Sequence, residues 1–404
     1  MVEEVRGVPG FESFRRPLPA AELRDAAAHG PVVAVNVSQR RADALLVSPD
    51  DVASLPLNLT AEDVYETVRA YVESVEQHQE CLAALENAMI VAQTAPTARH
   101  YQAYQKATSA LVEAETAMES VLTSTLEWLW ETIGLPVAEA CGLQAPLPES
   151  KVWPRMWWCP TGLLTLLPLH AAGFHREPGR SLMDRAVVSY TPSLRALTES
   201  RRWKRSTAPR DMLHVALHTT PGLSDLPHVR RERDLLTALF GTGCTTLEGS
   251  MADRASVLRE LPRHRCAHFS CHALSNSIRP AEGGLLLSDG LLSIGAIAAD
   301  HQHREFAFLS ACKTALGGLL APDESMTLSA ALHYTGYRHV IATLWSIHDS
   351  VAATVVEDVY REMYENGTLR CEHAAVALHR VVRRLRDMSP DNPSHWMPFT
   401  HTGP

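Results

Sequence analysis

Three short apolar runs, each followed by a side chain suited to acid–base or nucleophilic chemistry, constrain the fold of this chain most. The runs lie within Phe306–Thr314 (FAFLSACKT), Cys266–Ala273 (CAHFSCHA) and His339–Trp345 (HVIATLW). Buried parallel strands are apolar on both faces, so each run is typical of a central strand. Ligands and chemistry in open α/β sheets collect beyond the carboxyl ends of the strands. We therefore expect Cys312, His272 and Asp349 to lie at one edge of a sheet.

Around these runs, strand and helix patterns alternate from residue 212 to the C-terminus. The predicted strands and helices are Met212–Leu217, Val229–Phe240, Thr245–Leu247, Arg254–Leu261, Ser325–Tyr334, Val351–Tyr364 and Glu372–Met388, with a hairpin turn at Asp289 and Gly290. The segment HWMPFTHTG closes the chain. Such alternation predicts an α/β fold with a mostly parallel sheet that is covered by helices on both faces.

The N-terminal part of the chain has a different pattern. Val32–Val37 and Asp43–Val47 are predicted strands, and apolar residues then recur every three or four positions through Ala61–Gln93 and Ala98–Trp130. Pro96 interrupts this stripe, which predicts a long antiparallel helical hairpin within residues 61–133. A Pro-rich connection is expected from Pro136 to Pro154, and His170, a lone histidine in an apolar run, is interpreted as a packing residue.

A polar, basic segment, SRRWKRSTAPR, separates the two parts. We place a domain boundary there, between residues 1–205 and 206–404, and expect the basic residues Arg201–Arg205 to be exposed and flexible. Exposed connectors are preferred sites of cleavage, so the segment is either a site of self-cleavage or a solvated connector.

Composition excludes several classes of protein. Of 404 residues, 46% are hydrophobic and 21% are charged, which is typical of a globular chain with two or three domains. The sequence shows neither a signal peptide nor a run of 18 apolar residues, so we expect a cytoplasmic protein without a membrane partner. Eight scattered cysteines fit reduced thiols. The net charge of −9 argues against direct contact with nucleic acid.

The residues themselves suggest a thiol-dependent hydrolase. A cysteine protease needs a thiolate, a general base, and donors for the developing oxyanion. Cys312, His272 and the backbone N–H groups of Cys312 and Ala273 are candidates for these roles. Two alternatives remain at this point: Cys312 is a buried structural thiol, or the C-x-H-x-x-C-H cluster at 266–272 binds a metal. Strand alternation sends Cys271 and His272 to opposite faces, which disfavours the metal site, and no cofactor is predicted.

At these same residues the chain resembles a known family. HFSCHA (268–273) and FLSACKTALGG (308–318) are similar to the two signature blocks of the CHAT family, caspase-like cysteine peptidases related to separase. GGLLLSDGLLS, DESMTLSAALHYTGYRHVIATLWSIHDS, the final HWMPFTHTG and the WWCPTGLLTLLPLHAAG segment are also similar to CHAT regions that follow tetratricopeptide arrays. The resemblance extends over nearly the whole chain.

The resemblance implies a fold and an activity. The fold would be a caspase-like sheet flanked by helices, with residues 1–205 as a degenerate caspase-like half that carries the helical hairpin. The activity would be peptide-bond hydrolysis through a thioester, with Cys312 as nucleophile and His272 as base. Relatives often have glycine where this chain has Ala273, which affects the oxyanion geometry. No 34-residue repeat is present, so a separate tetratricopeptide or other regulatory protein is an expected partner, or the chain is a fragment.

Specificity is predicted from Asp349, which lies where separase-like relatives place the acid of the S1 pocket. A carboxylate there pairs with arginine before the cleaved bond (P1), and less specifically with lysine. Asp323 and Glu324 are competing acids, and Asp349 alternatively caps the following helix. The two functional classes are an active endopeptidase that cleaves a protein substrate after a basic residue, and a catalytically silent scaffold that binds proteins.

Overall fold

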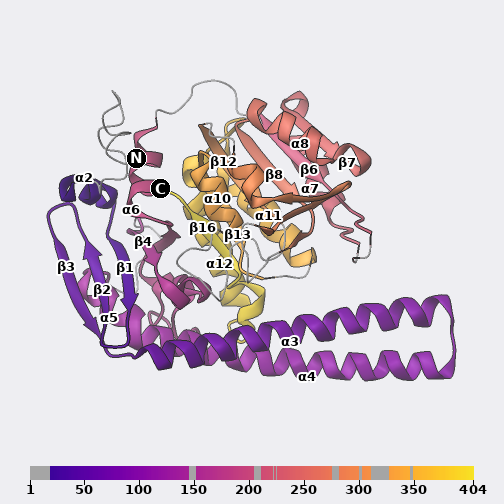
Figure 1. Ribbon diagram of the computed structural model, residues 1–404, viewed down its shortest axis with the longest axis horizontal. Coiled ribbons are helices and arrows are strands. Elements are labelled where there is room, and N and C mark those ends of the chain that lie inside the picture. Colours follow the sequence, from indigo (N-terminus) through magenta and orange to yellow (C-terminus); the bar gives the residue numbers. More distant parts are fainter. Residues whose placement is uncertain are drawn as a thin grey trace, which may run out of the picture.

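One long sheet organises the computed structural model, which describes residues 19–144, 152–203, 211–221, 223, 225–274, 282–299, 303–310, 327–345 and 349–404, with the side chains of 349 and 350 excepted. Across these residues, eleven strands pair in the order β3 (Val52–Leu57), β2 (Ala42–Val47), β1 (Val32–Val37), β4 (Arg155–Pro160), β5 (Val187–Tyr190), β16 (Phe399–Thr402), β13 (Tyr337–Thr343), β12 (Arg304–Leu309), β8 (Cys266–Ser270), β6 (Met212–Ala216) and β7 (Cys244–Glu248). The antiparallel pairs are β1–β2, β2–β3 and β13–β16. The predicted mostly parallel α/β sheet is confirmed (Figure 1).

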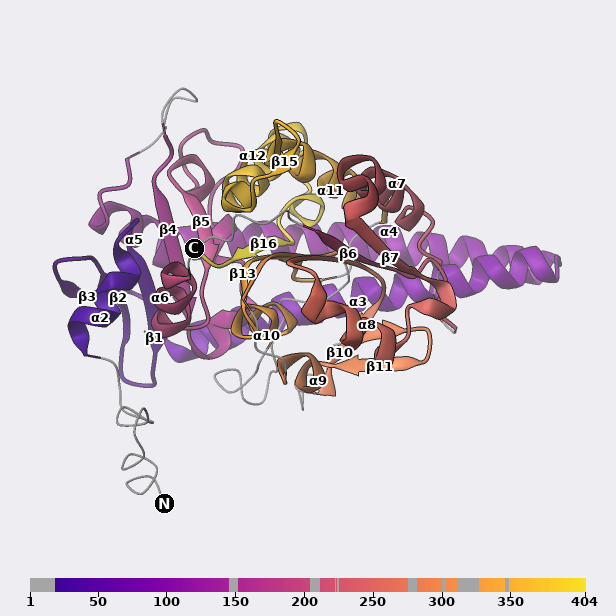
Figure 2. The same cartoon turned by 90° about the horizontal axis from the view of Figure 1, so that it is seen from above.

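Helices cover both faces of the C-terminal part of this sheet (Figure 2). One face carries α7 (Val229–Phe240), α11 (Asp349–Met363) and α12 (Ala374–Met388), and the other carries α8 (Arg254–Glu260), α9 (Ile294–Ala298) and α10 (Leu328–Tyr334). Alternate residues of β8 and β12 enter different cores: Cys266 and Phe308 pack on the first side, and Phe269 and Leu309 on the second. Burial on both faces explains why these strands are continuously apolar.

The helical hairpin is confirmed. It consists of α3 (Ala61–Thr94) and α4 (Ala98–Leu129), and Thr60 and Asp63 form a capping box that fixes its start. Its base is buried against the N-terminal strands through residues such as Val68 and Leu122. The far end projects beyond the sheet in both views and leaves Ile90 exposed (Figures 1 and 2). None of the described helices is long and apolar enough to cross a membrane.

Strand β16 connects the N-terminal and C-terminal parts of the sheet. It lies between β5 and β13, where Thr402 is opposite Tyr190 on one side and Val340 on the other. The indole N–H of Trp157, on β4, donates to the carbonyl of Gly403 at 2.8 Å. The predicted closing segment therefore completes the middle of the sheet and connects its N-terminal and C-terminal parts.

Smaller pairings complete the described fold. The strands β9 (Ala273–Leu274), β10 (Gly284–Leu287) and β11 (Gly290–Ser293) form a separate sheet, and β14 (Tyr364–Glu365) pairs with β15 (Thr368–Leu369). The predicted hairpin is β10–β11, and Leu287 opposite Gly290 places its turn at Ser288 and Asp289, one residue earlier than predicted. Gly290 opens β11 with φ +125°, a conformation that favours glycine.

Two N-terminal elements differ from the prediction. Pro136 was expected to begin a connection, but it lies in the first turn of the helix α5 (Leu135–Ala140). Proline is tolerated at this position because the N–H it lacks would have no partner within the helix. Strand β3 was not predicted: it is an edge strand that is largely exposed, so it lacks an apolar run, and its Pro56 is tolerated because edge strands need fewer ladder hydrogen bonds.

The predicted exposed connector begins later than expected. Helix α6 (Leu194–Arg202) includes Arg201, whose guanidinium donates to the carbonyl of Ala26 and lies 4.4 Å from the ring centre of Trp157. The prediction that Arg201 is exposed and flexible is therefore wrong, because its side chain is held between α6, the N-terminal helical segment that begins with α2 (Ala20–Arg24), and the sheet. Lys204 and Arg205 lie outside the described residues, and the boundary at 205 stays a prediction.

Candidate active site

The strands that lead to the predicted catalytic residues are neighbours. β8 and β12 are adjacent and parallel, and their register pairs Phe306 with Cys266 and Leu309 with Phe269. β13 lies on the other side of β12 and is also parallel to it. The carboxyl ends of β8, β12 and β13 therefore meet at one edge of the sheet, as the three apolar runs predict.

The predicted site residues are described to different extents. His272 follows β8 by two residues and is half-buried, and its carbonyl accepts a hydrogen bond from the N–H of Leu286 at 2.9 Å. Ala273 is the first residue of β9. Cys312 lies outside the described residues, as do the competing acids Asp323 and Glu324. Helix α11 begins at Asp349 itself, and the side chain of Asp349 lies outside the described residues as well.

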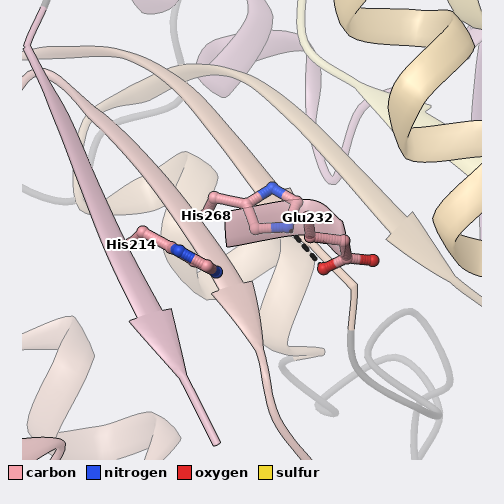
Figure 3. A group of neighbouring side chains, drawn as sticks. All are labelled: His214, Glu232 and His268. Carbon is pink, nitrogen blue, oxygen red and sulfur yellow. Dashed lines mark hydrogen bonds and ion pairs between the residues drawn. The ribbon is translucent and has the colours of Figure 1, made fainter. Parts of the chain in front are cut away.

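A buried carboxylate that was not predicted lies beneath these strand ends. Glu232, on α7, is 2% exposed and reaches the sheet between β8 and β12. Its Oε1 accepts the hydroxyl of Ser310 at 2.8 Å, and its Oε2 accepts the hydroxyl of Ser270. The same Oε2 lies 3.0 Å from Nε2 of His268 (Figure 3). Three donors from two neighbouring strands therefore converge on one carboxylate.

One placement of protons satisfies every contact in this cluster. Ser270 gives its hydroxyl proton to Glu232, so Nε2–H of His214 donates to the Ser270 oxygen at 3.0 Å. His268 donates from Nε2 and accepts at Nδ1 from the Tyr360 hydroxyl at 3.1 Å. Burial, followed by the nearby His268 and Arg233, holds the pKa of His214 well below its ordinary value, which agrees with a neutral ring.

Aromatic rings pack against the cluster. Tyr360, on α11, stacks on Phe308 with ring centres 6.0 Å apart, and His268 lies 5.3 Å from Phe308. Such contacts fix the rings whose polar atoms reach Glu232. The polar cluster is therefore held by the apolar core on the α7–α11 side of the sheet.

The same cluster meets a geometric criterion for binding a cation. Nitrogen atoms of His214 and His268 and a carboxylate oxygen of Glu232 all lie within 4.8 Å of one another. However, Nε2 of both rings and Oε2 of the carboxylate are already engaged in the hydrogen bonds described above. The arrangement is that of a hydrogen-bond network. In the earlier candidate cluster at 266–272, Cys266 and Cys271 pack in the two different cores of the sheet.

Known protein families and structures share the features of this sheet. The family model for the CHAT domain matches residues 123–404, which is more than half of the chain. This chain belongs to the CHAT-domain family. A search of curated proteins found no match for the CHAT chain.

Solved structures show the same fold. Two crystal structures of the Saccharomyces cerevisiae separase–securin complex, at 2.6 and 3.0 Å resolution, match the CHAT chain with TM-scores of 0.62 and 0.61. Both are 10% identical to it and cover 95% of its length. The CHAT chain spans only 31% and 30% of those chains. The likeness establishes a caspase-like fold of the separase type.

Sequence reasoning identified the strands of this CHAT domain but not Glu232. A signal for it is present in α7, where Val229, Glu232 and Leu236 recur at the spacing of one helix face and are all buried. A carboxylate on the buried stripe of a helix requires hydrogen-bond partners in the core. His170 was correctly interpreted as a packing residue: it is buried, and its Nε2 lies 3.0 Å from the Met397 carbonyl.

Proposed function

We propose that this CHAT domain is a cysteine endopeptidase, with Cys312 as nucleophile and His272 as general base. One observation supports the assignment most. The register of β8 and β12 pairs residues that are 40 positions apart, such as Cys266 with Phe306, and His272 and Cys312 are separated by the same number. Neighbouring strands lie about 4.8 Å apart. Continued for the few residues beyond the strands, this register would bring the imidazole and the thiol side by side.

The described end of β12 supports the same placement. Ser310 follows the last residue of β12 and is held by Glu232 at the level of Ser270. Two residues span at most about 7 Å of chain, so both members of the pair start close to the same edge of the sheet.

The reaction follows from these roles. His272 takes the proton from Sγ of Cys312, and the thiolate attacks the carbonyl carbon of the scissile peptide bond. The C–N bond then breaks as the leaving amine takes the proton from His272, which leaves a thioester on Cys312. Water, deprotonated by His272, attacks the thioester and releases the acid and the free thiol.

The register of β9 supports Ala273 as an oxyanion donor. The N–H of Leu286 bonds the carbonyl of His272, so His272 and Leu286 form a hydrogen-bonded pair in the antiparallel ladder. The next pair, Ala273 and Leu285, is then of the non-hydrogen-bonded type, in which the backbone groups point away from the partner strand. The N–H of Ala273 is therefore directed away from β10, and with the N–H of Cys312 it would receive the developing oxyanion.

Substrate selection is assigned to Asp349. A carboxylate at the carboxyl end of β13, beside the β12 end, is suited to bind the forked guanidinium of an arginine at P1. We expect Asp349→Ala to lose cleavage of an arginine substrate and to retain cleavage of a matched leucine substrate. An equal loss on both would mean that the residue only supports the start of α11.

Regulation and partners are also part of the proposal. The enzyme would act on a protein substrate and respond to a regulatory protein, such as a tetratricopeptide array. The neighbouring yeast structures are complexes of separase with securin, so a protein partner is known for that relative of the fold. The alternative function is a silent scaffold, which would bind partners without hydrolysis.

Labelling with an electrophilic arginyl peptide separates the two functions. We expect one label on Cys312, lost in Cys312→Ala and slowed strongly in His272→Ala. Cys81→Ala, which removes a half-buried thiol on the hairpin, serves as the matched control and should label normally. Equal labelling of the wild type and His272→Ala, with no peptide cleavage by either, would favour the scaffold.

A further inference from the structure

We propose that Glu232 is a positioning residue, which fixes the ends of β8 and β12 relative to each other and so sets the distance between His272 and Cys312. This inference rests on the proposed function, because it names what holds the catalytic pair in place. Glu232 contacts neither residue of the pair in the described part of the chain; it acts through the serines two positions before each of them.

The two carboxylate oxygens have different tasks. Oε1 is bonded to Ser310, after the end of β12, and Oε2 is bonded to Ser270, the last residue of β8. The register of the two strands makes these serines neighbours. Because both oxygens belong to one rigid group, a shift of either strand end along the other would break a hydrogen bond to a buried charge-bearing group.

The surroundings keep the carboxylate itself in place. His268 donates to Oε2 from the middle of β8, and Tyr360 holds the His268 ring from α11. His214, on β6, donates to Ser270, and the N–H of Leu217, just after β6, donates to the Ser270 carbonyl at 2.9 Å. The end of β8 is thus bonded from α7, from β6 and, through His268, from α11.

Such a device matters because a cysteine protease depends on the approach of two side chains. A displacement of about 1 Å can reduce the rate of a reaction between positioned groups by roughly 100-fold. Among the described residues, pairing between β8 and β12 ends at Phe269 and Leu309, and His272 and Cys312 each come three positions later in the sequence. The hydroxyls of Ser270 and Ser310 extend the connection between the two segments toward the catalytic pair.

A bound cation is the competing explanation of the same residues. A metal held by His214, Glu232 and His268 would have to displace hydrogen bonds, because both nitrogens of His268 and Oε2 of Glu232 are already engaged by Tyr360, Glu232, Ser270 and His268. The proton placement described above leaves no such requirement. The positioning role therefore explains all of the contacts, including those of the two serines, which the cation does not need.

The test compares single hydroxyl deletions with a matched control. Ser310→Ala and Ser270→Ala each remove one donor to Glu232, and Glu232→Gln changes the acceptor itself. Ser200→Ala is the control, since Ser200 is as buried as Ser270, at 1% exposure, but bonds only to Leu197 within its own helix. We expect Ser310→Ala and Ser270→Ala to reduce kcat by about 10- to 100-fold with KM changed less than about 2-fold.

Rescue distinguishes positioning from a general loss of stability. Ser310 is half-buried, so Ser310→Thr keeps the hydroxyl and adds only a methyl group. It should restore most of the kcat lost in Ser310→Ala, and the melting temperatures of both variants should stay close to that of Ser200→Ala. A wild-type kcat in Ser310→Ala and Ser270→Ala, in an enzyme that His272→Ala inactivates, would overturn the positioning role alone.

Two further results would decide the remaining cases. If the wild type cleaves no peptide and its Cys312 is no more reactive than in His272→Ala, the proposed function fails, and the positioning role fails with it. Metal analysis of protein made with added zinc is the last arm. One equivalent of zinc in the wild type that is lost in Glu232→Gln would replace the hydrogen-bond assignment by a cation site, whereas zinc-free active enzyme supports it.

Discussion

Two pairs of buried histidines in the same sheet show how differently one side chain is used. The rings of His214 and His268 are 5.3 Å apart, and so are those of His339 and His401. The first pair lies in the middle of β6 and β8 and is bonded to Ser270 and Glu232. The second lies on β13 and β16, where the N-terminal and C-terminal parts of the sheet meet.

The hydrogen bonds of the second pair lead to a guanidinium group instead of a carboxylate. The guanidinium of Arg155 donates to Ser189 at 2.8 Å, and Ser189 lies 2.8 Å from Nδ1 of His401. Arginine only donates, so the Ser189 oxygen accepts from it; the arrangement is consistent with Ser189 donating to Nδ1 of His401, and His401 donating from Nε2 to Nδ1 of His339 at 3.1 Å. Both histidine rings are neutral in this series of hydrogen bonds, and burial holds the pKa of each well below its ordinary value.

The contrast separates a positioning device from a structural joint. In the first cluster, donors converge on the Glu232 carboxylate, which fixes the ends of β8 and β12 relative to each other, close to the predicted catalytic pair. At the joint around β16, a linear chain of neutral groups bonds segments more than 200 residues apart. We therefore expect the joint to respond to acid, and the Glu232 cluster to respond to loss of its acceptor.

Acid should have the largest effect, and it should act on the buried histidines of the joint and of the segments that pack against β13 and β16. Burial lowers the pKa of His170 and His333 to about 4, and that of His379 to about 3. Below pH 6.5 the unfolded chain binds protons that the folded chain does not, so stability is present above that pH and is lost as the pH falls toward 4. Each such histidine costs about 3 kcal/mol by pH 4, and together they are comparable to the stability of a typical domain.

Urea unfolding followed at several pH values between 7.5 and 4.5 measures this loss. His379→Met is a suitable control, because the Nε2 atom of His379 has no hydrogen-bond partner in the described structure and its ring packs on Trp153. The variant should be about as stable as the wild type at pH 7.5 and should lose less stability in acid. A free energy of unfolding that does not change over this range would contradict the assignment of neutral rings to the buried histidines in and around the joint.

Removal of Glu232 should have the next largest effect. Glu232→Ala leaves the hydroxyls of Ser270 and Ser310 and the Nε2–H of His268 without their acceptor in the core. A buried donor without an acceptor costs about 1–3 kcal/mol, and three donors share Glu232, so we expect a total loss of about 3–5 kcal/mol. Chemical denaturation measures the loss, with Glu248→Ala on β7 as the control, because Glu248 is half-exposed and pairs with Arg233 near solvent. Equal destabilisation by both changes would show that Glu232 has no special place in the core.

Breaking the joint by its backbone should cost less. Gly403 has φ +124°, and a Cβ there would overlap the carbonyl oxygen of Arg338. Gly403→Ala must therefore strain the residue that also accepts the Trp157 indole N–H. We expect a loss of about 2–4 kcal/mol, from strain and overpacking together. Gly367→Ala is a control with φ +75° but open space around it, and its thermal unfolding should change less.

The sequence predicted the parts of this CHAT domain that are local. The stripe of α3 and α4 and the apolar runs of β8 and β12 are fixed by residues close together in the chain. The 40-residue separation of the apolar runs that begin at Cys266 and Phe306 matches the register of the two strands. These features depend on periodicity and burial, which sequence patterns report directly.

Long-range features could not be predicted in the same way. The strand β16 has the sequence FTHT, which contains only one strongly apolar residue, and its partners β5 and β13 are distant in the chain. From sequence, Glu232 is one more charge on an amphipathic helix; that it is buried follows only from the fold, in which α7 packs on β6 and the Glu232 side chain reaches β8. Arg201 was misjudged for the same reason, since its partner Trp157 is contributed by a strand far away in sequence.

The smallest effect on stability is expected for substitution of Arg155, the charged residue of the joint. Arg155 is buried, and burial, followed by repulsion from Arg201, lowers its pKa to about 10. Within the described ranges it forms no ion pair with a carboxylate, and its Nε has no hydrogen-bond partner. What holds it is the Trp157 ring, 4.7 Å away, and one bond to Ser189. Replacing a buried charge by an apolar side chain of similar length is often neutral or stabilising, because desolvation no longer opposes folding.

We therefore expect Arg155→Met to change the free energy of unfolding by no more than about 1 kcal/mol at pH 7.5. Ser189 keeps its bond to His401, since it needs only an acceptor for its proton, so the neutral chain from Ser189 to His339 persists. The acid response should become weaker, because a positive charge near these rings is removed and their protonation is opposed less. A loss as large as that of Glu232→Ala would mean that the guanidinium holds the joint as the carboxylate holds the strand ends, and the contrast between the two clusters would be lost.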